Sequence, residues 1–133
     1  MAKHFTALVA VAILGGSPPL LAHHSFAATF DATKPLKLTG TVTSIEWANP
    51  HVFFYIDVVD EQSGAVDNWA IELPSPNALA RNGWSRNSMT IGDKVVVEGS
   101  PARDGSRLGS ARSVALSATG RRLFDMSGGA GNR

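Results

Sequence analysis

The sequence holds four histidines, and three of them lie where they could bind a metal ion. His4 is part of an N-terminal segment with the features of an export signal, and His23 and His24 follow the residue after which that signal should be cut. Cleavage after Ala22 would give a mature protein that begins with His23. Its α-amine and its imidazole are two nitrogens that can hold one metal ion. The remaining histidine is His51.

Copper(II) is the metal ion that these ligands favour. It prefers imidazole and amine nitrogens in a tetragonal plane, and it leads the Irving–Williams order. His23 would supply two nitrogens and His51 a third, provided that the N-terminal segment folds back onto the loop before His51. His24 competes for the third position, because its backbone amide lies beside the amine. Zinc would need a closed tetrahedron or an added carboxylate.

The alternative interpretation gives these histidines no ligand role. His23 and His24 would then extend into solvent, as chain termini often do, and His51 would only begin a strand. The carboxylates of Glu46 and Glu72 do not indicate a site either, because alternation along the strands places both side chains on the solvent side. Nothing in their spacing requires an acid–base pair. Since no nucleophile, acid and base converge in the sequence, an enzyme is the class of protein that we expect least.

The first 22 residues have the pattern of a secretory signal peptide. Lys3 gives a positive start, and residues 5–14 form a run that is apolar except for Thr6. Residues 15–18 form a polar break, and Ala22 is a small residue before the cut. The apolar run is too short to span a bilayer, which takes about 20 residues. We therefore expect a periplasmic or secreted product with no stable membrane insertion after cleavage.

Composition narrows the possible partners. The chain has 12 basic and 11 acidic residues, and removal of the signal with Lys3 leaves a nearly neutral mature protein. A nucleic-acid partner would call for a clearly basic face, so we expect none. The chain has no cysteine, which excludes thiolate zinc sites, iron–sulfur clusters and cysteine nucleophiles.

Strand patterning extends over residues 38–116 and predicts a small β-barrel. The first strand changes the parity of its apolar residues after Val42, which indicates a β-bulge, and Gly40 should help the strand to bend. Ser75 is a good N-cap for a short helix, with Pro76 at its first position and Gly83 at its end. The expected strands are residues 38–47, 51–59, 66–73, 94–99 and 110–116, and residues 121–124 could add a short edge strand.

Three strands, one short helix and two further strands are the order of an OB-fold. We therefore predict an all-β protein with one short helix, in the form of an OB-fold-like, five-stranded Greek-key barrel. Residues 23–124 would form this single domain, with residues 23–37 as an irregular lead-in. Residues 125–133 are predicted to be a disordered tail.

Two runs of sequence stand out beyond their ligand chemistry. They are His-His-Ser-Phe at residues 23–26 and Glu-Trp-Ala-Asn-Pro-His at residues 46–51. Together with Asn68-Trp69 and the run at residues 72–77, they make the chain resemble a family of functionally uncharacterised, small, exported bacterial proteins. The resemblance implies export and a single compact β-domain. It implies no activity, so the copper hypothesis rests on ligand chemistry alone.

Two functions are consistent with these observations. The first is an exported protein that binds copper through His23 and His51, with His24 as an accessory or alternative ligand. The second is an OB-type binding module without a metal. Its exposed barrel face, with Trp47, Tyr55 and Trp69, would hold a small ligand, a glycan or a periplasmic protein partner.

Overall fold

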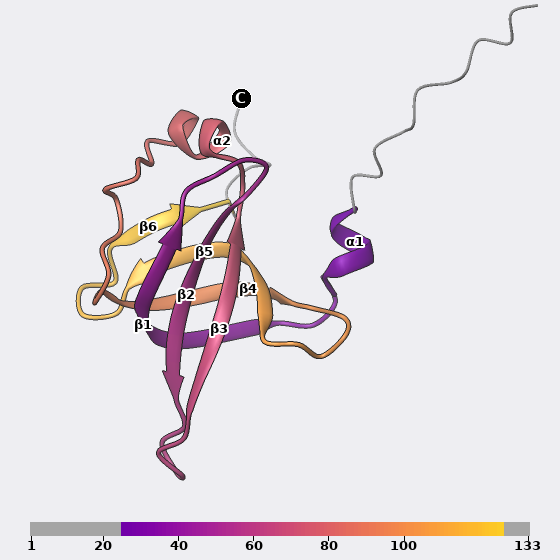
Figure 1. Ribbon diagram of the computed structural model, residues 1–133, viewed down its shortest axis with the longest axis vertical. Coiled ribbons are helices and arrows are strands. Elements are labelled where there is room, and N and C mark those ends of the chain that lie inside the picture. The colour runs from indigo at the N-terminus through magenta and orange to yellow at the C-terminus, as the bar shows by residue number, and fades with distance from the viewer. Residues whose placement is uncertain (1–24, 127–133) are drawn as a thin grey trace, which may run out of the picture.

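The protein is an all-β barrel, seen in a computed structural model that describes residues 25–126 (Figure 1). Strand β1 pairs with β2 and β4, β2 pairs with β3, and β4 pairs with β5. A parallel pairing of β3 with β5 closes these five strands, and β6 extends the sheet beyond β5. The expected OB-like, five-stranded barrel is thus confirmed. The elements are α1 (Phe26–Thr29), β1 (Leu36–Glu46), β2 (Val52–Val59), β3 (Val66–Leu73), α2 (Pro76–Arg81), β4 (Lys94–Pro101), β5 (Leu108–Leu116) and β6 (Arg122–Asp125).

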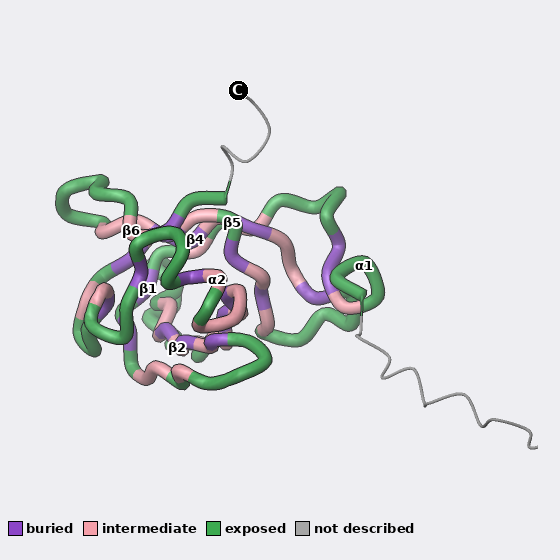
Figure 2. The backbone as a smooth tube through the Cα atoms, turned by 90° about the horizontal axis from the view of Figure 1, so that it is seen from above, coloured by how far each residue is buried: buried purple, intermediate pink, exposed green. Residues whose placement is uncertain are grey.

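Alternating apolar residues of the strands fill the barrel. Buried stretches recur in each of its five strands (Figure 2). Each such side chain contributes about 1.5–3 kcal/mol when it is fully buried. Helix α2 adds Leu79, and its N-cap Ser75 accepts a hydrogen bond from the backbone of Ala78, at 3.3 Å. The fully buried strand residues are Val42, Val52, Phe54, Ile56, Ile71, Leu73, Val95, Val97 and Val114.

Two β-bulges bend the barrel strands. In β1 the register shifts between Val42 and Ser44, which confirms the bulge expected from the change of parity. In β5 the register shifts between the partners of Glu98 and Gly99, which leaves Arg112 as the extra residue. A Cβ atom at Gly99 would collide with the carbonyl of Ser110. Glycine at this position therefore allows β4 to approach the bulged strand closely.

The pairing that closes the barrel is short. Only three residue pairs join β3 to β5, and they are Ala70 with Leu108, Ile71 with Gly109, and Glu72 with Ser110. We call this pairing the seam of the barrel. Its two strands are separated in the sequence by α2 and β4.

The described part of the lead-in, residues 25–35, has defined structure, whereas the sequence predicted an irregular segment. Helix α1 is a single turn, and Phe30, which is 2% exposed, forms a β-bridge with Ala102. The backbone N–H of Asp31 donates to Pro101 at 2.9 Å. The lead-in is thereby attached to the loop between β4 and β5. Its α1 lies beside the barrel rather than within it (Figure 1).

Candidate functional site

The candidate site is built around a contact between the side chains of His51 and Glu72. The His51 Nδ1 atom lies 2.5 Å from the Glu72 Oε1 atom, and the two side chains are 47% and 18% exposed. His51 directly precedes β2, and the peptide bond between Asn49 and Pro50 in the preceding turn is cis. The register of the hairpin pairs Phe53 with Glu72. His51 lies two residues before Phe53 on the same strand face, so it is the diagonal neighbour of Glu72.

Burial and charge act in opposite directions on Glu72. Partial burial raises the pKa of the Glu72 carboxyl above its usual value, because the charged form loses solvation. The adjacent His51 imidazole lowers the same pKa by its charge and its hydrogen bond, and it offsets part of the rise. The pair therefore consists of a half-buried carboxylate and a half-exposed imidazole, held together at the surface of the barrel.

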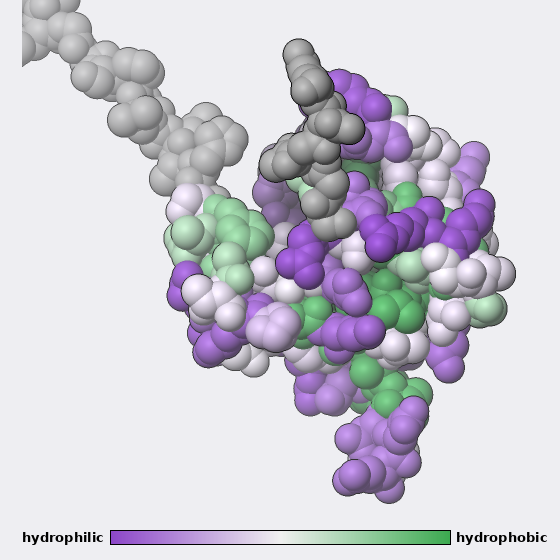
Figure 3. Space-filling model, turned by 180° about the vertical axis from the view of Figure 1, so that it is seen from behind, coloured by the Kyte–Doolittle hydropathy of each residue, from purple (hydrophilic) through white to green (hydrophobic). Residues whose placement is uncertain are grey.

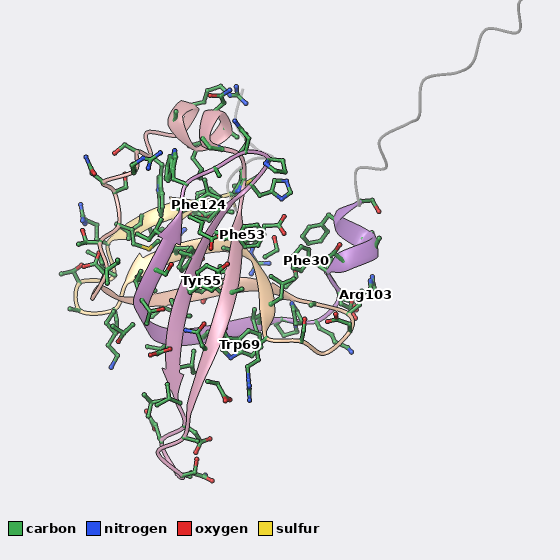
Figure 4. All side chains as sticks on the ribbon, viewed as in Figure 1. Phe30, Phe53, Tyr55, Trp69, Arg103 and Phe124 are labelled. Carbon is green, nitrogen blue, oxygen red and sulfur yellow. The ribbon has the colours of Figure 1, made fainter. Side chains whose placement is uncertain are left out.

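A groove of about 1060 Å³ runs beside this pair. One wall is the outer face of the barrel, which contributes His51, Glu72 and Phe53. The opposite wall is the lead-in, which contributes residues 25–32 in part, including Phe30. In Figure 4, Phe30 lies between α1 and the barrel strands that carry Phe53. The start of the described chain and His51 therefore line the same groove.

The structure describes one of the three predicted ligands. His23 and His24 lie outside the described residues, and Ser25 follows them directly. Within residues 25–126, no group of three or more His, Cys, Asp or Glu side chains could hold a metal ion. The part of the site that can be seen is thus the pair His51–Glu72 and the groove in front of it.

Sequence reasoning missed the contact of Glu72 with His51. The expectation that its side chain points out of the barrel core is correct, but the outer face at this point is a groove wall rather than open surface. Of the aromatic residues assigned to a binding face, Trp47 and Trp69 pack partly buried against the core. The Tyr55 hydroxyl donates to Glu46 at 3.2 Å. The aromatic side chain of β2 that lines the groove is that of Phe53.

No helix in the described part of the chain is long and apolar enough to cross a membrane. No curated protein matches the sequence. Among solved structures, the chain is similar to the crystal structure of a complex of TiaS with tRNA and ATP, at 23% identity and a TM-score of 0.46. That match covers 65% of this chain and only 18% of the other. The family of unknown function DUF6152 matches residues 10–112, and the chain therefore belongs to that family, which agrees with the resemblance seen in its motifs.

Proposed function

We propose that the protein is an exported metal-binding protein, periplasmic or secreted, which holds copper(II) with His23 at its mature N-terminus and with His51. The observation that carries this proposal is the groove: His51 lines one wall, and Ser25 lines the other. Two residues of chain span at most about 7 Å. A mature N-terminus at His23 therefore has the reach to place its amine and imidazole at the mouth of the groove.

The hydrogen bond between His51 and Glu72 prepares the imidazole as a ligand. Glu72 engages the Nδ1 atom, so the Nε2 atom on the opposite side of the ring remains for a metal ion. A histidine that binds a metal almost always donates a hydrogen bond from its other ring N–H to a carboxylate, a carbonyl or water. The carboxylate fixes the tautomer and the ring orientation, and it makes the ligating nitrogen more basic.

The complete ligand set would be three nitrogens. His23 supplies its amine and one ring nitrogen, and His51 supplies Nε2. His24 is the accessory or competing ligand, as its backbone amide adjoins the amine. Three nitrogens with an open fourth position suit copper(II) better than zinc, which would require a fourth protein ligand in a structural site. The arrangement depends on signal cleavage after Ala22, because any preceding residue removes the free amine.

The test is a copper(II) titration of the mature protein, purified with an authentic His23 terminus. One comparison protein carries a single additional alanine before His23, and the others carry His51→Ala and His24→Ala. We expect one-to-one binding, weakened at least about tenfold by the extension and by His51→Ala. Electron paramagnetic resonance of the copper(II) complex should show coupling to fewer nitrogen atoms in the extended protein and in His51→Ala than in the mature protein. If neither the extension nor His51→Ala changes the affinity for copper(II), the proposed site does not exist.

A further inference from the structure

The groove has an apolar side that the metal proposal does not use. Phe26 and Phe30 of the lead-in lie with their ring centroids 5.3 Å apart, and both line the groove together with Phe53. Phe26 is 49% exposed, so about half of its side chain is in contact with solvent. Figure 3 shows hydrophobic side chains gathered at the outer surface of α1. An apolar molecule in the groove would cover the rings of Phe26 and Phe53, whereas Phe30 is already buried.

The barrel wall of the groove carries hydrogen-bond donors. Ser100 of β4 and Ser110 and Arg112 of β5 all line the groove. Arg112 is the extra residue of the β5 bulge, and bulges commonly redirect a side chain next to a functional site. The backbone carbonyl of Arg112 accepts a hydrogen bond from Met126 at 2.8 Å, which fixes the end of β6 beside it.

Among residues 25–126, the side chains of Ser100, Ser110 and Arg112 form no hydrogen bond or ion pair with another described residue. The acidic residue that lines the groove is Glu72, and it already pairs with His51. Arg112 is therefore the charged group of the groove wall that lacks a partner of opposite sign among the described residues.

We infer that the groove binds a small amphipathic carboxylate. Its carboxylate would meet the guanidinium of Arg112, whose planar arrangement of donors fits a carboxylate with two hydrogen bonds. Its aliphatic or aromatic body would lie against Phe26 and Phe53. The groove volume of about 1060 Å³ is slightly larger than the roughly 300–1,000 Å³ of typical small-molecule sites, so the groove has room for such a ligand. This binding requires no metal ion and so goes beyond the proposed copper site.

The probe is decanoate, with decanol as the uncharged analogue of equal length. Both are titrated by calorimetry and by NMR into the mature protein, kept metal-free with a chelator. We expect saturable, one-to-one decanoate binding with a dissociation constant below about 1 mM. The amides of Ser110 and Arg112 should shift most. Because the decanoate titration contains no metal ion and the copper titration contains no decanoate, each proposal succeeds or fails on its own measurement.

Two variants separate the roles of charge and apolar surface. Arg112→Gln should weaken decanoate binding about tenfold and decanol binding by less than about threefold, since only decanoate loses a charged hydrogen bond. The matched control is Arg121→Gln, which changes an exposed arginine outside the groove and should alter neither affinity. Phe53→Ala should weaken both ligands. Circular dichroism establishes that each variant is folded.

Several outcomes would overturn the inference. They are the absence of saturable decanoate binding, equal effects of Arg112→Gln and Arg121→Gln, or equal losses of decanoate and decanol in Arg112→Gln. A stable dimer whose dissociation exposes the groove would also overturn it, because the apolar wall would then belong to an interface between two copies. Ultracentrifugation of the metal-free protein at the concentrations of the titration distinguishes that case.

Discussion

Replacing Arg103 with alanine should loosen the lead-in without affecting the barrel. The Arg103 side chain donates from Nε to the Ala27 carbonyl at 2.7 Å, and its guanidinium lies 3.7 Å from the Asp31 carboxylate. It thus joins the β4–β5 loop to the backbone of α1. Two backbone hydrogen bonds remain after its removal, from Asp31 to Pro101 and from residue 103 to Thr29, both at 2.9 Å. The segment therefore stays attached but opens more often.

The size of the effect follows from the exposure of the contact. A hydrogen bond from a charged donor contributes about 1.5–3 kcal/mol when shielded from water. The Arg103 side chain is 48% exposed, and exposed ion pairs contribute only about 0–1 kcal/mol. We therefore expect the free energy of local opening to fall by about 1 kcal/mol, which corresponds to a roughly fivefold larger open population.

Amide hydrogen exchange followed by NMR measures this opening directly. In Arg103→Ala, the amides of Asp31 and of residue 103 should exchange about fivefold faster, and those of the barrel core should not change. Arg107→Ala is the matched control, because Arg107 lies in the same loop and pairs at 2.6 Å with Asp67 instead of the lead-in. Equal acceleration in both variants, or none in Arg103→Ala, would refute the reasoning that Arg103 holds the lead-in over the groove.

Three further predictions concern the site and the fold. Glu72→Gln should lower the affinity for copper(II) 10–100-fold, because His51 loses its charged partner. Competition with a chelator measures this affinity, and an unchanged value would show that Glu72 does not support His51 as a ligand. Hydrogen bonds lower the folded-state pKa of Asp31 below its usual 3.8, so its charge stabilises the fold above that pH, and this contribution is lost as the pH falls through the lower value. Asp31→Asn should therefore lower the melting temperature near neutral pH and converge with the unmodified protein in acid, whereas a constant difference at all pH values would argue against this. Leu79→Ala should destabilise the protein by about 2–5 kcal/mol in denaturant unfolding, because Leu79 is fully buried, while the exposed Ile91→Ala should cost less than about 0.5 kcal/mol.

The strands and the barrel could be predicted because their signals are local. The alternation of Val52, Phe54 and Ile56 marks the inner face of β2, and the structure buries all three completely. The change of parity in β1 marked its bulge. Ser75 and Pro76 marked the start of α2, where the structure shows the expected cap. Each of these features depends on residues close together in the sequence, so one chain suffices to find it.

The lead-in and the pair of His51 with Glu72 depend on contacts between distant segments. Helix α1 has one turn, and its N-cap Ser25 forms no side-chain cap. It is held instead by the β-bridge between Phe30 and Ala102, which no local sequence pattern predicts. Similarly, His51 meets Glu72 only in the observed hairpin register. A shift of one residue would move Glu72 to the other face, and the loop between β2 and β3 does not determine the register from its sequence alone.

The short seam between β3 and β5 places the proposed binding surface where only three residue pairs close the barrel. Glu72 and Ser110, which pair across the seam, both line the groove. A pairing of three residues contributes few hydrogen bonds, so the barrel should open more readily here than along its longer strand pairings. When the seam opens, the hairpin that carries His51 and Glu72 separates from the wall that carries Arg112. Ligand capture in the groove would then favour the closed barrel, and the captured molecule would hold the seam shut.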